Sequence, residues 1–361
     1  MSSPKAHINW IDGLKGISAV IVLLCHLRLA FKTVVDDNSL MYTFPLNILF
    51  SGGLAVSIFI VMSAMIMTIQ CANASRWHAI LVKRYFRFVL PITAVLCVYW
   101  LFCYAGLLYN NTLAEEIDNM QLMSSYSLRF KTIIKSILLS PIGGGSQYLG
   151  VLWMLKYVFL SPVFAILLDL LLSNLKPLPE LLCIVLICYI FHTTDPYFLN
   201  VIYGFLLIHI PDKYGNRILI PESRKRWYAI LLFCLFLSVV YFHSKVEFLR
   251  LHNAAFTTLK GCLLVAVVYL SPLSRRILSM NIFRYLGKIS FEIYLLHLIV
   301  IYSLSCYMYM SIPAFEHRML IVWAVAIIVT LVMSWIWNKY VNHYINRCID
   351  NFTNDIFRNN E

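Results

Sequence analysis

The chain has 361 residues and a net charge of +12; 61% of its residues are hydrophobic, 13% are charged, and its mean hydropathy is +0.77. A soluble domain is about half apolar and about a quarter charged, so this composition excludes an ordinary soluble protein. A helix needs about 20 apolar residues to cross a bilayer, which leaves room for about ten crossings and for no large soluble domain.

Apolar windows predict ten membrane-spanning helices, so we expect an all-α, polytopic transmembrane helical bundle. The first apolar run contains Asp12 and Lys15, and no small-residue cleavage site follows it. We therefore expect no cleavable signal peptide. Residues 1–338 are predicted to form the membrane domain and residues 339–361 a cytoplasmic C-terminal tail. The predicted spans are residues 11–31, 48–70, 88–109, 150–172, 180–194, 197–210, 227–243, 254–271, 289–310 and 318–338.

The basic residues favour one orientation of these spans. With the N-terminus inside, 18 Lys and Arg residues fall in cytoplasmic segments and 7 fall in outer segments. Basic residues concentrate in cytoplasmic loops, so this asymmetry predicts both termini inside and a multi-pass protein of the inner (plasma) membrane. The net charge is then a topology signal, and we expect no nucleic-acid partner. The seven outer residues are Lys32, Arg129, Lys131, Lys135, Lys245, Arg250 and Arg318.

The first predicted span carries Asp12, Lys15 and His26 in its apolar run. Such residues are costly in hydrocarbon and by default face the protein interior or a wet cavity. Lys15 and His26 are eleven residues apart, which is three turns plus about 20°, so they share one helix face. Asp12 is placed to neutralise Lys15. Two plainer interpretations stay open: Asp12 and Lys15 as a pair at the membrane surface, and His26 as an interhelical hydrogen-bonding group.

A cationic patch follows the second predicted span. Arg84 and Arg87 lie one helical turn apart and, with Lys83, on the predicted cytoplasmic surface. Guanidinium groups bind phosphates through paired hydrogen bonds, so the patch suits a ligand that carries phosphates. Ordinary anchoring of a span by cytoplasmic basic residues is the alternative.

Only one predicted outer loop is long, residues 110–149. It contains an amphipathic stretch at 126–139, followed by Pro141 and by glycines at 143–145. Long loops in compact domains are often functional, so this loop could shape an acceptor site. An interfacial helix without such a role is the alternative.

The ninth predicted span contains Glu292 and His297, which are secondary candidates for the site. Ser290, Tyr294 and Trp153 are secondary candidates as packing or cavity-lining groups. No Ser shows the nucleophile-elbow pattern, and the cysteines show neither CxxC spacing nor a His-rich neighbour. We therefore expect no metal site.

Four segments resemble motifs of the acyltransferase-3 family of membrane acyltransferases, in the family's order along the chain. The first is DGLKGIS at residues 12–18 followed by His26, with Lys15 where the family usually has Arg. The others are similar to the family's entry to its second helix, its R-x-x-R-x-x-P segment and its L-G-x-x-S-Y-x-x-Y-L-x-H segment. They are residues 53–63 (GLAVSIFIVMS), 84–91 (RYFRFVLP) and 286–297 (LGKISFEIYLLH). A fifth match, LWML at 152–155, is partial, because Lys156 stands where one branch of the family has Glu.

The resemblance implies a membrane enzyme that moves an acyl group, most commonly acetyl, from cytoplasmic acyl-coenzyme A to a hydroxyl of a cell-surface or exported glycan. It implies acetyl-CoA as the donor substrate, with Arg84, Arg87 and Lys83 as donor-binding residues. His26, with Lys15 and Asp12, is then the catalytic group. Imidazole titrates near the working pH, which suits His26 to act as a general base. Transfer through an acyl-histidine is the rival mechanism.

Two other functions stay open. A transporter or flippase could use the intramembrane Lys, His and Glu residues as a proton or substrate path, and it fits composition and topology equally well. It gives no reason for four ordered motifs. The enzyme could also act on a small molecule or a lipid. The sequence leaves the acceptor, the acyl group and the oligomeric state open.

Overall fold

The structure is a computed structural model that describes residues 9–35, 40–71, 77–124, 130–143, 148–215, 222–246 and 253–358. Every regular element in these ranges is helical, which confirms the predicted all-α fold class. The chain divides into two compact units. Unit 1 comprises Met1–Ser18, Gly53–Ser75 and Leu160–Lys288, and unit 2 comprises Ala19–Gly52, Arg76–Phe159 and Ile289–Glu361.

Nine helical segments in the described ranges are long and apolar enough to cross a membrane. The chain is therefore a polytopic helical membrane protein. The sixth predicted span is α8 (Leu199–Tyr214), a shorter helix of 16 residues that follows a turn at Asp195 and contains Pro211. The nine are Asn9–Ala30, Gly52–Cys71, Ala79–Tyr104, Gly150–Leu172, Pro177–Thr194, Arg224–His243, Asn253–Leu270, Ser290–Ser311 and Arg318–Thr353.

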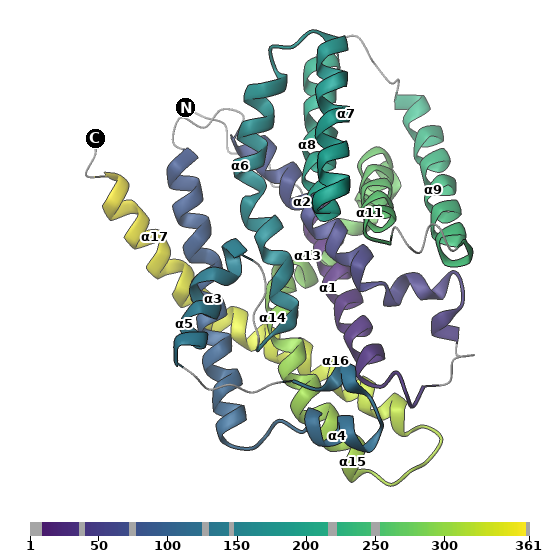
Figure 1. The fold of residues 1–361 in the computed structure, drawn as a ribbon, viewed down its shortest axis with the longest axis vertical. Helices are drawn as coiled ribbons and strands as arrows, with labels where there is room; N and C mark the ends of the chain where they lie inside the picture. Colours follow the sequence, from purple (N-terminus) through teal and green to yellow (C-terminus); the bar gives the residue numbers. More distant parts are fainter. Residues whose placement is uncertain are drawn as a thin grey trace. The chain divides into compact units, whose positions relative to one another are not determined.

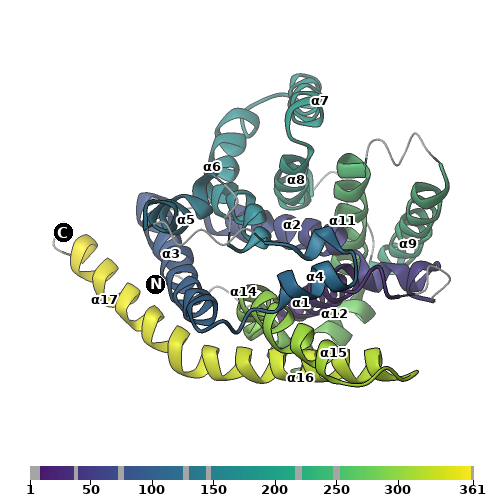
Figure 2. The same cartoon turned by 60° about the horizontal axis from the view of Figure 1, so that its bottom comes forward.

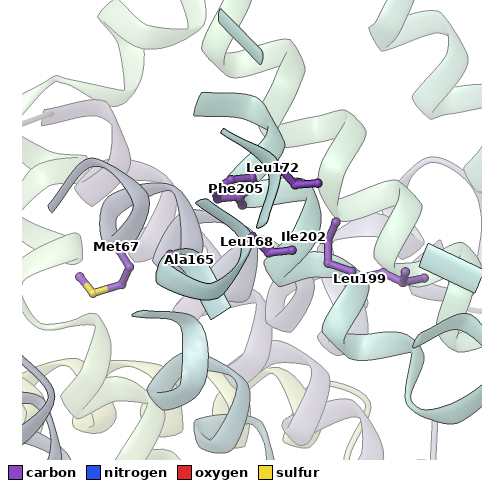
Figure 3. Close-up of a cluster of buried hydrophobic side chains, with 7 residues drawn as sticks. All are labelled: Met67, Ala165, Leu168, Leu172, Leu199, Ile202 and Phe205. Carbon is purple, nitrogen blue, oxygen red and sulfur yellow. The ribbon is translucent and has the colours of Figure 1, made fainter. Parts of the chain in front are cut away.

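Unit 1 is built around an apolar core between three helices (Figure 3). Its seven buried side chains come from α2 (Gly52–Cys71), α6 (Leu155–Leu172) and α8. Two helix pairs extend this core, and both views show each pair side by side: α7 (Pro177–Thr194) with α8, and α9 (Glu222–Lys245) with α11 (Asn253–Leu270) (Figures 1 and 2). The seven residues are Met67, Ala165, Leu168, Leu172, Leu199, Ile202 and Phe205.

Glycines let the helices of unit 1 approach one another closely. Gly204 of α8 lies against the α2 backbone at Val61, and Gly261 of α11 lies against Ser57 of α2. Gly287, at the end of α13 (Asn281–Lys288), lies against the backbone of Asp12. A Cβ atom at any of these glycines would collide with its neighbour, and small residues are how membrane helices reach such short separations. The first and last motif segments of the sequence therefore meet in unit 1.

One buried carboxylate ties the ends of α6, α7 and α8 together. Glu180 is 3% exposed and accepts hydrogen bonds from His209 at 3.0 Å, Lys213 at 2.5 Å and Tyr214 at 2.6 Å. Lys213 also donates to the carbonyl of Leu172 at 2.7 Å, at the end of α6. Both oxygens of the carboxylate thus have donors. A buried charge that is paired and hydrogen-bonded in this way is tolerated, whereas breaking the pair is strongly destabilising.

The last span of unit 2 continues into the segment predicted to be a tail. α16 (Arg318–Trp337), the π-helical turn η7 (Asn338–Asn342) and α17 (His343–Arg358) form one continuous, bent helical run (Figure 2). The helix α17 packs against α3 (Trp77–Tyr104), where Lys83 pairs with Asp350 at 2.6 Å and the ring of Phe86 meets that of Phe352 at 5.1 Å. The sequence predicted a tail here because the polar residues of 339–358 lower the mean hydropathy of the segment. One face of the helix is nevertheless packed against α3.

The long predicted loop is partly helical in unit 2. It contains α4 (Asn110–Glu116), η3 (Met120–Leu122) and α5 (Phe130–Gly143), so the predicted amphipathic stretch is a helix over its described part. Asn119 donates to the carbonyls of Leu29 and Ala30, both at 2.9 Å, which satisfies the end of α1 (Asn9–Ala30). The amide of Tyr109 donates to the carbonyl of Tyr302 at 2.8 Å. The loop is therefore fixed to the helix end that follows His26.

Candidate functional site

Helix α1 carries the three site candidates of the first predicted span, Asp12, Lys15 and His26. In unit 1, Asp12 and Lys15 form an ion pair with 3.9 Å between the carboxylate oxygen and Nζ. This is the neutralising contact that the sequence predicts. His26 lies in unit 2, one turn before the end of α1.

His26 and His297 come together in unit 2. Their ring centroids are 4.9 Å apart and the ring planes are tilted by 60°. His26 is half-buried, whereas His297, in the middle of α14 (Ser290–Val300), is fully buried. The sequence placed His297 among the secondary candidates, and the structure moves it directly beside His26.

The backbone fixes the tautomer of each imidazole. The Nδ1 atom of His26 lies 2.9 Å from the carbonyl of Val22, and that of His297 lies 3.0 Å from the carbonyl of Ile293. A carbonyl only accepts, so each Nδ1 carries the proton and donates it. Each Nε2 is left with a lone pair. An imidazole held in this way is ready to accept a proton at Nε2.

The carboxylate of Glu292 is held by two amides from η7. Glu292 is 1% exposed, and its Oε1 accepts from Nδ2 of Asn338 at 2.7 Å and from Nδ2 of Asn342. The π-helical turn places both amides on one carboxylate, and such turns occur frequently at functional sites. The buried Tyr294 donates its hydroxyl to the carbonyl of Val151, and its ring lies 6.1 Å from that of His297.

Two further secondary candidates lie at the edges of this region. Ser290 is buried at the first position of α14. Trp153 is half-buried in η4 (Gly150–Met154), the turn that Tyr294 contacts through Val151, and its ring lies 6.0 Å from that of Tyr157. Both are therefore in unit 2.

The three residues of the cationic patch differ in their contacts. Arg84 donates to the carbonyl of Val158 at 2.6 Å and stacks over the ring of Phe88 at 5.5 Å. Lys83 is paired with Asp350, so it is engaged in the packing of α17 on α3. Arg87 is exposed. The exposed guanidinium of Arg87 can donate to a phosphate, and Lys83 would have to leave Asp350 to join it.

Several residues of the site were outside the sequence prediction. Asn338 and Asn342 lie at the boundary between the predicted last span and the tail, and nothing in the sequence pairs them with Glu292. A weak signal exists, because polar residues recur every four positions along 330–342 and so mark one face of a helix. Among the described residues, no group of three or more His, Cys, Asp or Glu side chains could hold a metal ion. The polar residues of this face are Thr330, Ser334, Asn338 and Asn342.

Comparison with protein families decides the class of this protein. The chain matches the acyltransferase domain of the acyltransferase-3 family over residues 8–338, nearly its whole length. The chain belongs to this family. Together with the apolar helices, this makes it a membrane acyltransferase that uses an acyl donor. Comparison with curated proteins found no match, and neither did comparison with solved structures.

Proposed function

We propose that this membrane acyltransferase transfers an acetyl group from acetyl-coenzyme A to a hydroxyl of a cell-surface or exported glycan, with His26 as the general base. The observation that carries the proposal is the state of His26. Its Nδ1 is committed to the Val22 carbonyl, its Nε2 keeps a lone pair, and the residue is half-buried beside a second neutral imidazole. Acyl transfer needs a base with a free lone pair that can take the proton of the acceptor hydroxyl.

The reaction is balanced without a metal or a redox group. The acceptor hydroxyl attacks the thioester carbonyl carbon while its proton moves to Nε2 of His26. The new C–O bond forms, the C–S bond breaks, and the thiolate of coenzyme A takes the proton from Nε2. His26 returns to its starting tautomer, since Nδ1 keeps its proton on the Val22 carbonyl throughout.

Arg84 and Arg87 are the proposed donor-binding cations. Coenzyme A carries its phosphates at the end far from the thioester, and guanidinium groups bind phosphates strongly. Lys83 contributes only when the donor displaces Asp350 from it. Lys15, paired with Asp12 in unit 1, keeps a positive charge at the position where the family usually has Arg.

The acceptor is proposed to approach from the outer side of the inner (plasma) membrane. The orientation with both termini inside places the loop at 110–149 on that side. Asn119 holds this loop on the end of α1, one turn beyond His26. A segment so placed is suited to shape the entry of a glycan hydroxyl.

The test is transfer of labelled acetyl from acetyl-CoA to surface glycan in proteoliposomes, normalised to folded protein. We expect His26→Ala to lower the rate by at least about 10²-fold, because a positioned base contributes about 10²–10⁴-fold. The exposed His317 of unit 2 provides the control, and His317→Ala should keep full activity. Full turnover by His26→Ala would overturn the assignment and favour a transport role. Deleting the gene and comparing acyl groups on surface glycans would identify the acceptor.

A further inference from the structure

Two short helices of unit 1, α12 (Pro272–Leu278) and α13 (Asn281–Lys288), connect two candidate membrane spans. One span ends at Leu270 and the next begins at Ser290. Crossing a bilayer takes about 20 residues, so neither short helix can cross, and the connection stays at one membrane surface. In the predicted orientation, with both termini inside, this is the cytoplasmic surface.

The connection is basic throughout. Residues 271–288 contain three arginines, Lys288 and neither Asp nor Glu. In the described part of the chain, none of the three arginines forms an ion pair with a carboxylate. The Nε atoms of Arg275 and Arg284 are buried, and each lacks a hydrogen-bond acceptor there. Guanidinium groups in this state are suited to donate to a phosphate. The three arginines are Arg275, Arg276 and Arg284.

Apolar side chains are exposed beside these cations. On α12, Leu273 and Ile277 are one turn apart and exposed, and Arg276 lies on the same exposed side. On α13, Ile282 and Tyr285 are one turn apart and likewise exposed. An apolar face with cations at its edge is typical of a helix that lies in the headgroup layer of a membrane.

The two short helices are also held on the start of α1, within unit 1 (Figure 1). Gly13 lies against the carbonyl of Leu278, at the end of α12, and Gly16 lies against Leu286 of α13. A Cβ atom at either glycine would collide with its neighbour, so the two glycines permit this close contact. The position of α12 and α13 at the membrane surface is thus coupled to the position of α1.

We propose that α12 and α13 form a binding surface for anionic phospholipid. The arginines bind the lipid phosphate, and the four exposed apolar side chains contact the upper part of the acyl chains. A soluble anion such as coenzyme A would use the arginines alone and gives no reason for the exposed apolar side chains beside them. Bound lipid holds α12 and α13 in the headgroup layer, and through Gly13 and Gly16 it fixes the depth of α1 in the bilayer. The inference is independent of the proposed function, because it involves neither the acyl donor nor the acceptor.

The test measures lipid binding to the purified full-length protein in a neutral detergent. Phosphatidylglycerol is the anionic probe and phosphatidylcholine is the neutral one, and native mass spectrometry counts the lipid molecules that stay bound during a titration. The test variant is Arg276→Gln/Arg284→Gln. Its charge-matched control is Arg224→Gln/Arg226→Gln, because these two arginines are exposed in unit 1 at the start of a candidate span, on the same predicted side of the membrane. Ile282→Ser removes an exposed apolar contact without changing the charge.

We expect the wild type to bind phosphatidylglycerol more tightly than phosphatidylcholine. The test variant should lose affinity for phosphatidylglycerol by about fivefold for each charge removed, with a smaller loss at high salt. The control should keep the wild-type affinity, and Ile282→Ser should weaken the binding of both lipids.

Three results would overturn the inference. The first is a wild type without preference for the anionic lipid, and the second is an equal loss in the test variant and the control, which would be a general effect of net charge. The third is a test variant that keeps its lipid but binds acetyl-CoA more weakly, which would assign the arginines to the donor. Arg276→Gln alone, at an exposed position, keeps the test decisive if the double variant fails to fold.

Discussion

Glu180 in unit 1 and Glu292 in unit 2 are both buried in helices, yet their surroundings differ. Glu180 accepts from a lysine, a histidine and a tyrosine, and both of its oxygens are used. Glu292 accepts from two neutral amides on one oxygen, and its other oxygen has no donor in the described part of the chain. Both oxygens of Glu180 are used within the described part of unit 1, which suits a role in joining helices, whereas Glu292 is held by neutral amides alone. We therefore predict a structural role for Glu180 and a role at the candidate site for Glu292.

The largest effect should come from breaking the saturated cluster. Glu180→Ala leaves Lys213, whose side chain is 20% exposed, among carbonyls without its counter-ion. Removing one partner of a buried ion pair costs about 3–5 kcal/mol, and the partial exposure of Lys213 places the expected loss near the lower end. Thermal unfolding in detergent measures this loss, while acetyl transfer per folded molecule should be kept. The control is Glu116→Ala, because Glu116 is exposed and a surface change alters stability by no more than about 0.5 kcal/mol. A Glu180→Ala protein that is stable but inactive would make Glu180 a site residue and end the contrast.

The proposed donor-binding arginines should show the opposite pattern, a loss of donor binding without a loss of stability. Replacing Arg84 and Arg87 with Gln should weaken donor binding by about 1.5–3 kcal/mol for each charged hydrogen bond lost. Folding should survive, since Arg87 is exposed and Arg84 is only partly buried. Binding of acetyl-CoA to the purified, folded double variant is the measurement. Unchanged affinity would return both arginines to the role of positive-inside anchors.

The sequence predicted the spans better than the contacts between them. Long apolar runs are local, so the helices could be placed from windows alone. The errors were in bounds: α3 begins at Trp77, eleven residues before the predicted span, and α8, with 16 residues, is not among the nine candidate spans. Glu180 and Lys213 are 33 residues apart, and Lys213 was counted only as a topology signal, because a local pattern cannot show its partner. His26 was visible as a lone histidine in an apolar helix. Its pairing with His297, 271 positions later, depends on tertiary packing and was missed.

A smaller effect should follow from the loop that holds the end of α1. Asn119→Ala removes two hydrogen bonds to the carbonyls of Leu29 and Ala30, each worth about 0.5–1.5 kcal/mol. If the loop positions the acceptor, the KM for the acceptor should rise while the KM for acetyl-CoA stays the same. Asn111→Ala is the comparison, because the hydrogen bonds of Asn111 to Ser124 lie within the loop. Equal changes in both KM values would mean that the loop acts on the whole site.

The smallest effect should come from the ion pair between α17 and α3. Asp350→Asn removes a partly exposed bridge to Lys83, and such pairs contribute about 0–1 kcal/mol. Stability should therefore change little. If Asp350 competes with donor phosphates for Lys83, the affinity for acetyl-CoA should rise slightly in low salt and return to the wild-type value in high salt, because salt screens exposed charges. A weaker affinity at low salt would contradict that competition.

The continuity of α16, η7 and α17 has a consequence for how this protein can be shortened. The family match ends at residue 338, in the first position of the π-helical turn. A chain trimmed at that point would keep His26, His297 and both arginines, yet it would lose the amide of Asn342 that donates to Glu292 and the helix α17 that packs against α3. Where a domain ends by resemblance and where it ends by hydrogen bonding are thus different positions here. An expression clone that ends at residue 338, where the family match ends, would lack the helix that packs against α3.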